Sequence, residues 1–282
     1  LTELQGAAHP PIAPQARVSV PAPVSSALSA QEVSTATGVR AASNSETDSQ
    51  QAPKVQMPKP IDIKGHESFQ GQSLYSTDWP TTPVDFSGKR VAVVGTGSTG
   101  IQLATHIAKT AKELFVLQRT PSWSVPANNK PLTPEYVASV KANYAQERER
   151  KRHSMDGLGL PGPEKAAFEA TDEERQAHYQ YIYDNLSPFT FFGSYLDVLV
   201  DDEANKTISD FLGSKIHERV NDPAIAEKLI PKSYPFGTRR TCIDTGYYEI
   251  FNQENVHLVD LLESPLKSVT ADGFETEDAA YE

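Results

Sequence analysis

The chain carries three glycines, Gly95, Gly97 and Gly100, whose G-x-G-x-x-G spacing can hold the pyrophosphate of a dinucleotide. In such a motif the first two glycines permit a tight turn and let backbone N–H groups approach the pyrophosphate at the positive end of the next helix. The third glycine lets that helix pack closely against the preceding strand. We therefore predict that the following residues bind a cofactor: Gly95, Thr96, Gly97, Ser98, Thr99, Gly100, Ile101 and Gln102.

The segments around these glycines have the patterns of the strand–turn–helix–strand unit that the motif needs. Residues 91–94 are a short apolar run, which predicts a strand buried on both faces. Residues 98–111 have a helical pattern, and residues 114–117 form the next apolar run. In this context the spacing indicates a Rossmann-like unit with a parallel sheet. The helix positions that we expect to be buried are Ile101, Ala104, Thr105, Ala108 and Ala111.

The end of the second predicted strand distinguishes between the two nicotinamide dinucleotides. An NAD site usually has an acidic residue there, which accepts hydrogen bonds from the ribose 2′-hydroxyl. Here the strand ends in Arg119 and Thr120, a guanidinium and a hydroxyl that suit a 2′-phosphate. The alternative is that Arg119 is simply a solvated charge at a strand end. At this distance from the glycines we favour NADP(H) as the cofactor.

Composition sets limits on the possible partners of the chain. Its 282 residues can hold two modest domains, or one domain with a large insertion. The formal net charge of -11 argues against nucleic acid and anionic membranes as partners. No apolar run has the length of a membrane span, and we predict no metal site. The single cysteine, Cys242, permits no internal disulfide, which favours the cytoplasm.

The N-terminal part differs in composition from the rest of the chain. Residues 1–68 contain no Phe, Tyr or Trp and are rich in Pro, Ala, Ser and Gln. Such a segment buries too little apolar area to offset its chain entropy, so we expect residues 1–56 to be disordered. The chain opens on Leu1 rather than Met and has no signal-peptide pattern, so we expect a fragment or a processed product.

The middle of the chain has the periodicity and start signals of helices. Thr133 and Pro134 begin one helix, Thr171 and Glu174 form a capping box, and Asp222 precedes a further short helix. We therefore predict a helical insertion at about 131–232. The α/β pattern then returns, with a helix at 246–251, a strand at 256–259 and a turn at 271–273. The predicted organisation is a tail (1–56), a linker (57–88) and an NADP-binding Rossmann-like α/β domain (89–282).

Several motifs in order resemble the Baeyer–Villiger monooxygenases. The fingerprint of that family is F-x-G-x-x-x-H-x-x-x-W-(P/D), shortly before an NADPH-binding G-x-G-x-x-G. Phe69, Gly71, Trp79 and Pro80 fit it, but Tyr75 stands in place of the histidine. The family also has a second glycine motif, for FAD, upstream of the fingerprint, and residues 1–56 contain only two glycines. The other segments that resemble the family are 88–102, 118–121, 234–240 and 247–252.

The resemblance implies an activity and roles for two further arginines. In that family NADPH reduces FAD, and the flavin with O2 converts a ketone into an ester or lactone. By resemblance Arg240 is the catalytic cation that stabilises the negative charge developing in this reaction, and it also contacts the cofactor. Arg239 joins Arg119 on the 2′-phosphate. The alternative is that both are solvated arginines on a loop.

Three functional hypotheses follow from the sequence. The first is an NADPH- and FAD-dependent Baeyer–Villiger monooxygenase, of which this is a partial chain that needs a complementary FAD domain. The second is a non-catalytic NADP-binding remnant, or a pseudoenzyme that needs a partner. The third is an unrelated NADP-dependent reductase, which is the weakest. The Tyr-x-x-x-Lys pair of short-chain reductases is absent, because Val140 follows Tyr136 and Phe251 follows Tyr247 at that spacing.

Overall fold

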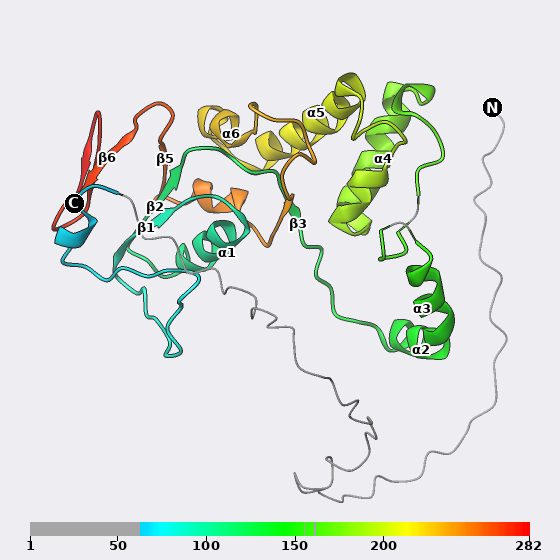
Figure 1. Ribbon diagram of the computed structural model, residues 1–282, viewed down its shortest axis with the longest axis horizontal. Coiled ribbons are helices and arrows are strands. Elements are labelled where there is room, and N and C mark those ends of the chain that lie inside the picture. The colour runs from blue at the N-terminus through cyan, green and yellow to red at the C-terminus, as the bar shows by residue number, and fades with distance from the viewer. Residues whose placement is uncertain (1–62, 155, 161) are drawn as a thin grey trace, which may run out of the picture. The chain divides into compact units, whose positions relative to one another are not determined.

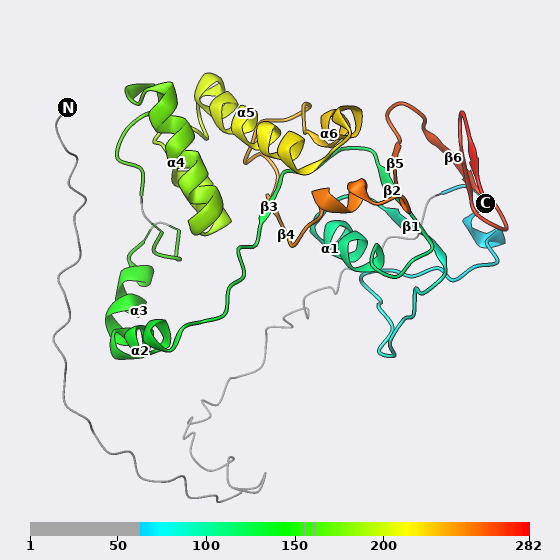
Figure 2. The same ribbon diagram turned by 180° about the vertical axis from the view of Figure 1, so that it is seen from behind.

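The computed structural model describes residues 63–154, 156–160 and 162–282 (Figures 1 and 2). The predicted tail over residues 1–56 lies outside these residues. The helices are α1 (Ser98–Ile107), α2 (Pro134–Ala142), α3 (Tyr144–Arg152), α4 (Asp172–Asn185), α5 (Asp202–Arg219) and α6 (Pro223–Leu229). The strands are β1 (Arg90–Val94), β2 (Glu113–Gln118), β3 (Ser124–Pro126), β4 (Cys242–Asp244), β5 (Val256–Asp260), β6 (Leu266–Val269), β7 (Phe274–Thr276) and β8 (Ala280–Tyr281).

A parallel sheet with the strand order β1-β2-β5 carries the predicted glycine motif. Helix α1 follows β1 and packs on one face of this sheet (Figure 1). Its predicted apolar positions are buried together with Leu114 and Val116 of β2. The helix ends at Ile107 rather than Ala111, because the chain tightens into turns in which the N–H of Thr110 donates to the carbonyl of Ile107. The predicted strand–turn–helix–strand unit is confirmed.

The burial predicted for β1 is wrong on one of its two faces. Val93 is buried, whereas Ala92 is exposed and the side chain of Val94 is 61% exposed. In the described part of the chain β1 is an edge strand of the sheet. The apolar cluster on that side of the sheet contains Leu117 and Val259, which belong to β2 and β5. Among the described residues, β1 is therefore covered only on the face that packs against α1.

Helices α2 to α6 lie between β3 and β4 along the chain, and these two strands pair with each other in parallel. The predicted helix starts are confirmed: the hydroxyl of Thr133 accepts from the N–H of Tyr136, Thr171 and Glu174 form the capping box, and Asp222 caps α6. Because β3 and β4 pair, the start and the return of the helical segment lie side by side. None of the helices in the described part of the chain combines the length and the hydropathy of a membrane span.

The fingerprint segment packs against an antiparallel sheet, β6-β7-β8. The N–H of Val269 donates to the carbonyl of Lys64, and the N–H of Gln70 donates to that of Ala271, in the predicted turn between β6 and β7. The ring of Phe69 lies so close to Gly71 that a Cβ there would overlap it, which explains the glycine. The helix predicted at 246–251 is a short 3-10 helix, η5 (Tyr248–Asn252).

Candidate functional site

The glycine turn between β1 and α1 leaves open space in which part of a ligand can lie. Gly95 has a φ of 96°, a left-handed conformation that favours glycine. A Cβ at Gly95 or Gly97 would meet no described atom within 4 Å, whereas a Cβ at Gly100 would overlap the carbonyl oxygen of Gly95. The third glycine is therefore needed for close packing, and the first two border free space, as the motif predicts.

The beginning of α1 has the features of an anion-binding helix end. Gly97 is its N-cap and offers no side chain, so no side-chain oxygen caps the helix. The first turn also contains no acidic residue. The first N–H groups of a helix have no partner within it and carry a partial positive charge. At α1 these groups remain available to a phosphate.

The end of β2 lies beside this turn. The hydroxyl of Thr96 donates to the carbonyl of Thr120 at 2.9 Å, and the N–H of Gly95 donates to the carbonyl of Leu117 at 3.0 Å. These two bonds hold the glycine turn against the residues that follow β2. Arg119 is exposed at this place. The structure therefore brings Arg119 and Thr120 next to the predicted phosphate-binding turn.

Residues 234–242, which contain Arg239 and Arg240, lie at the same edge of the sheet as the glycine turn. The hydroxyl of Tyr234 donates to the carbonyl of Pro121 at 2.8 Å, and the N–H of Cys242 donates to the carbonyl of Trp123, also at 2.8 Å. The hydroxyl of Ser98, at the start of α1, lies 3.4 Å from Sγ of Cys242. Burial raises the pKa of the Cys242 thiol, so this group stays protonated at neutral pH. Residues 234–242 are thus fixed beside both the glycine turn and the end of β2.

Charge at this edge is positive and uncompensated. Arg119, Arg239 and Arg240 are exposed, and none of them forms an ion pair with a described residue. The guanidinium carbon of Arg239 lies 4.6 Å from the centroid of the Tyr234 ring. The side chain of Arg240 makes no hydrogen bond within the described residues, and its predicted role remains an expectation. Cations without acidic partners beside an open helix end suit an anionic ligand.

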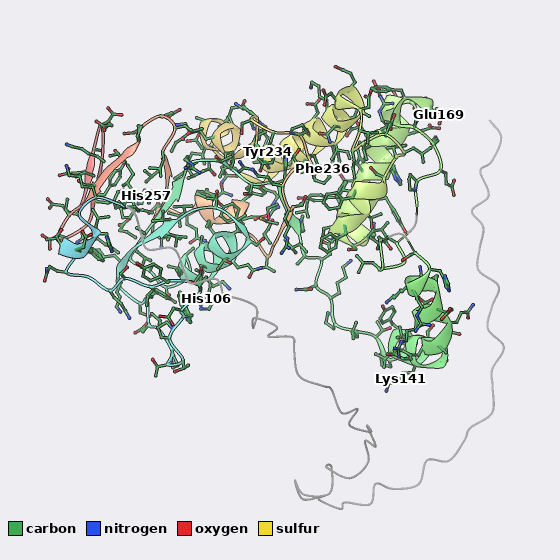
Figure 3. All side chains as sticks on the ribbon, viewed as in Figure 1. His106, Lys141, Glu169, Tyr234, Phe236 and His257 are labelled. Carbon is green, nitrogen blue, oxygen red and sulfur yellow. The ribbon has the colours of Figure 1, made fainter. Side chains whose placement is uncertain are left out.

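Sequence reasoning placed Tyr234 in a segment that resembles the family without giving it a role, and it missed Asn205. Asn205 of α5 is buried and holds the chain just before the arginines: its amide donates to the carbonyl of Phe236 and accepts from the N–H of Phe236, at 2.8 and 2.9 Å. Figure 3 labels Tyr234 and Phe236 between β3 and α5. A signal for Asn205 was present, because this polar residue lies at a position of α5 whose neighbours at helical spacing, Ile208 and Leu212, are core residues.

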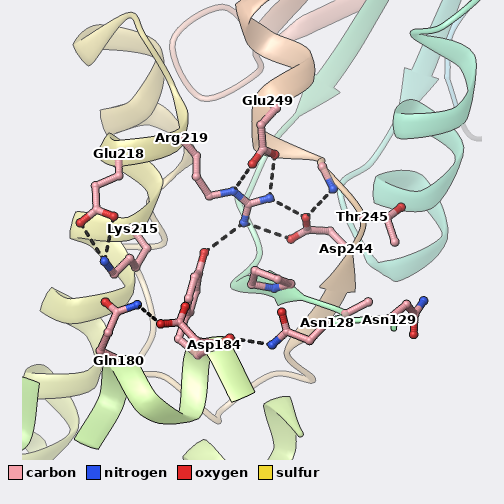
Figure 4. Close-up of a pocket in the computed structure, with 14 residues that line it drawn as sticks. Asn128, Asn129, Gln180, Asp184, Lys215, Glu218, Arg219, Asp244, Thr245 and Glu249 are labelled. Carbon is pink, nitrogen blue, oxygen red and sulfur yellow. Dashed lines mark hydrogen bonds and ion pairs between the residues drawn. The ribbon is translucent and has the colours of Figure 1, made fainter. Parts of the chain in front are cut away.

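A cavity of about 520 Å³ lies elsewhere and contains none of the predicted site residues (Figure 4). It lies between α4, α5 and the residues after β4. Its charged groups all contact other residues that line it: Arg219 contacts Asp244 and Glu249, Lys215 contacts Glu218, and Asp184 accepts a hydrogen bond from the amide of Gln180. Because these groups contact one another, we interpret the cavity as part of a structural polar network.

The structure also shows why glycine spacing alone is a weak signal. Gly157, Gly159 and Gly162 repeat the G-x-G-x-x-G spacing. They follow the end of α3 rather than a strand of a parallel sheet. A guanidinium nitrogen of Arg150 donates to the carbonyl of Gly159, within the space next to that glycine. The middle glycine of this second set therefore lacks the open space found at Gly97.

Comparisons with known proteins cover most of the chain. A family model described as flavin-binding monooxygenase-like matches residues 52–136. The 2-oxo-Δ3-4,5,5-trimethylcyclopentenylacetyl-CoA monooxygenase of Pseudomonas putida is 41% identical over 227 residues, which are 78% of this chain and 42% of that protein. A Baeyer–Villiger monooxygenase of Pseudooceanicola batsensis is 36% identical over 216 residues, 76% of this chain and 39% of that protein.

A solved structure, that of OTEMO in complex with FAD and NADP, is 41% identical, with a TM-score of 0.76. The match covers 79% of this chain and 43% of that one. The chain therefore spans about two fifths of the length of the relatives that it matches.

Proposed function

We propose that this chain, a homologue of the Baeyer–Villiger monooxygenases over about four fifths of its length, binds NADPH at the edge formed by the glycine turn, the end of β2 and residues 234–242. The backbone N–H groups at residues 95–102 would hold the pyrophosphate. Arg119, Thr120 and Arg239 would hold the 2′-phosphate, and Arg240 would lie toward the reacting end of the cofactor.

The observation that carries this proposal is the set of three arginines without acidic partners beside an open glycine turn. Of the other described arginines, four, among them Arg175 and Arg219, form ion pairs with carboxylates. The other two without an ion pair, Arg90 and Arg148, lie at the start of β1 and in α3. A phosphate bound at this edge would supply the negative charge that Arg119 and Arg239 lack among the described residues. A guanidinium stays charged and presents a rigid fork of donors, which matches a phosphate better than an ammonium does.

For the complete reaction we propose that NADPH bound here reduces FAD and that a ketone is oxygenated with O2. Bound FAD would supply the oxygen-transfer chemistry, and Arg240 would stabilise the negative charge that develops on the reacting oxygen atoms. An arginine can do this because it remains protonated in a dry pocket. The cytoplasm is the location that we propose, because Cys242 is a free buried thiol.

The uncovered face of β1 is the surface that we propose to meet an FAD-binding part. Strands of parallel sheets are normally covered on both faces. Ala92 and Val94 are apolar and exposed, and they immediately precede the glycine turn. A flavin-binding partner on this face would cover apolar surface and would also lie next to the cofactor. A non-catalytic NADP-binding remnant, one form of our alternative, would have no need of such a partner.

A chimeric enzyme tests the proposal directly. Residues 57–282 of this chain would replace the homologous segment of the Pseudomonas putida monooxygenase, and NADPH oxidation and ester formation would be measured with a cyclic ketone. We expect both activities. The same chimera with Arg240→Ala should oxidise NADPH and form little ester. A folded, flavin-containing chimera that binds NADPH and does not oxidise it would favour the non-catalytic alternative.

A further inference from the structure

Tyr234 contacts both of the segments that carry the arginines at the glycine turn. Its hydroxyl donates to the carbonyl of Pro121 at 2.8 Å, and Pro121 follows Arg119 and Thr120 directly. Its ring lies under the guanidinium of Arg239, whose central carbon is 4.6 Å from the ring centroid. One side chain therefore joins two segments that are more than one hundred residues apart in the sequence.

The surroundings of Tyr234 favour both its hydrogen bond to Pro121 and its packing against Arg239. The side chain is partly buried and packs against the hydrophobic core, so its position is fixed from below. Burial raises the pKa of the Tyr234 phenol, so at neutral pH the hydroxyl keeps the proton that it donates to Pro121. Arg239 has no acidic partner among the described residues, and a free arginine loses much side-chain entropy when it binds a ligand. A ring beneath the guanidinium reduces this loss of entropy, because it holds the guanidinium in place before the ligand binds.

We propose that Tyr234 is a positioning residue that determines the preference for NADPH over NADH. Its ring holds Arg239, and its hydroxyl fixes that ring beside the end of β2, so that Arg239 and Arg119 approach a 2′-phosphate together. This inference rests on the proposed function, since it assumes that a 2′-phosphate binds here. Tyr234 itself makes no contact with the cofactor in this proposal and acts through Arg239.

Binding titrations of NADPH and NADH to variants of the full chain test this role. The measured quantity is the ratio of the two dissociation constants. The variants are Tyr234→Leu, which removes ring and hydroxyl, Tyr234→Phe, which removes the hydroxyl, Arg239→Ala, and the double variant Tyr234→Leu/Arg239→Ala. A matched control is Phe168→Leu, because the ring of Phe168 lies 4.9 Å from the guanidinium carbon of Arg175, in the helical segment.

We expect Tyr234→Leu to lower the preference for NADPH about three- to tenfold, with little change in NADH binding, because a ring beneath an arginine contributes on that scale. Tyr234→Phe should fall between wild type and Tyr234→Leu. In the Arg239→Ala background the Tyr234→Leu change should have no further effect on the ratio, because the two residues act as one unit. Phe168→Leu should leave the ratio unchanged.

Additive effects of the two changes, or a wild-type ratio in folded Tyr234→Leu, would overturn the inference and leave the proposed function standing. If Tyr234→Leu does not fold, the test rests on Tyr234→Phe. A wild-type ratio of the two dissociation constants in Tyr234→Phe overturns the proposal that the hydroxyl fixes the ring. If Arg239→Ala binds NADPH with the wild-type preference, the 2′-phosphate contact in the proposed function is wrong, and this inference is overturned with it.

Discussion

Nη2 of Arg219 lies 2.6 Å from Oδ1 of Asp244, so the last residue of α5 is joined to the last residue of β4. The side chain of Asp244 is buried and that of Arg219 is partly buried, and Arg219 also contacts Glu249 at 2.7 Å (Figure 4). Asp244 further accepts from the hydroxyl of Ser124 in β3 at 2.7 Å. The helical segment and the strand that follows Arg240 are therefore held together by one ionic network centred on the buried carboxylate of Asp244.

Replacement of Arg219 by alanine should destabilise the protein strongly. The change leaves the buried carboxylate of Asp244 without its cationic partner, and removal of one member of a buried pair costs about 3–5 kcal/mol. Urea unfolding of Arg219→Ala and wild type at neutral pH measures this difference. Lys206→Ala is the control, since its ion pair with Asp210 is exposed and should contribute less than about 1 kcal/mol. Equal midpoints for Arg219→Ala and wild type would contradict the role of the network.

The contribution of Asp244 should disappear at acid pH. Burial by itself would raise the pKa of Asp244, but hydrogen bonds with Arg219 and its charge outweigh burial and hold this pKa below its usual value. A carboxyl group whose pKa is lowered by folding stabilises the folded state above its unfolded pKa, about 3.9. This stabilisation is lost as the pH falls through the lower folded pKa.

We therefore expect the free energy of unfolding of wild type to exceed that of Asp244→Asn at pH 6, and the difference to shrink as the pH falls below about 4. Unfolding curves of both proteins at a series of pH values measure it. A difference that stays constant down to acid pH would mean that the ionised carboxylate contributes nothing beyond what the amide provides.

Two glycines of the same turn should respond differently to alanine. Gly97 has a φ of -78°, and a Cβ there meets no described atom within 4 Å, so Gly97→Ala should fold with an almost unchanged melting temperature. Its methyl group would occupy the space proposed for the pyrophosphate, so NADPH binding should be lost. Gly100→Ala should instead lower the melting temperature, because its Cβ overlaps the carbonyl of Gly95. Thermal unfolding and NADPH titration of both variants separate these effects. Normal NADPH binding by Gly97→Ala would exclude the turn as the pyrophosphate site.

Asn205 should support the segment that leads to Arg239. Asn205→Ala leaves the N–H and the carbonyl of Phe236 without their partner, which should cost about 2–3 kcal/mol of stability and weaken NADPH binding more than NADH binding. Thr207→Val in the same helix is the control, because it removes a hydrogen bond to Tyr179 at 2.7 Å, away from the arginines. It should lower stability without a change in cofactor preference. The same shift in preference in both variants would contradict a specific role for Asn205.

The features that sequence predicted well are those that depend on neighbouring residues. The caps at Thr133 and Thr171 involve residues three positions apart, and the glycine turn lies between adjacent elements, so local patterns were sufficient. The apolar run of β1 did not predict its exposed face, because an apolar run does not reveal that a strand lies at the edge of a sheet. The contact between Tyr234 and Pro121 joins residues 113 positions apart, and such a contact leaves no local pattern.

The structure brings the backbone of the predicted site and its three arginines to one edge of the sheet. Arg119 and Arg239 lie on segments that Tyr234 connects. The role of Arg240 depends on a flavin and a ketone, and it rests on the resemblance to the family alone. The assignment of individual residues to the cofactor stays a prediction.

The preference between NADPH and NADH tests the central claim most directly. Isothermal titration of the purified chain with each nucleotide, for wild type and Arg119→Ala, measures it. Wild type should bind NADPH more tightly, and Arg119→Ala should lose about 1.5–3 kcal/mol of NADPH binding while NADH binding hardly changes, because one charge-assisted hydrogen-bonded contact is removed. Equal affinity of wild type for NADPH and NADH would contradict the claim that this edge of the sheet is built for a 2′-phosphate.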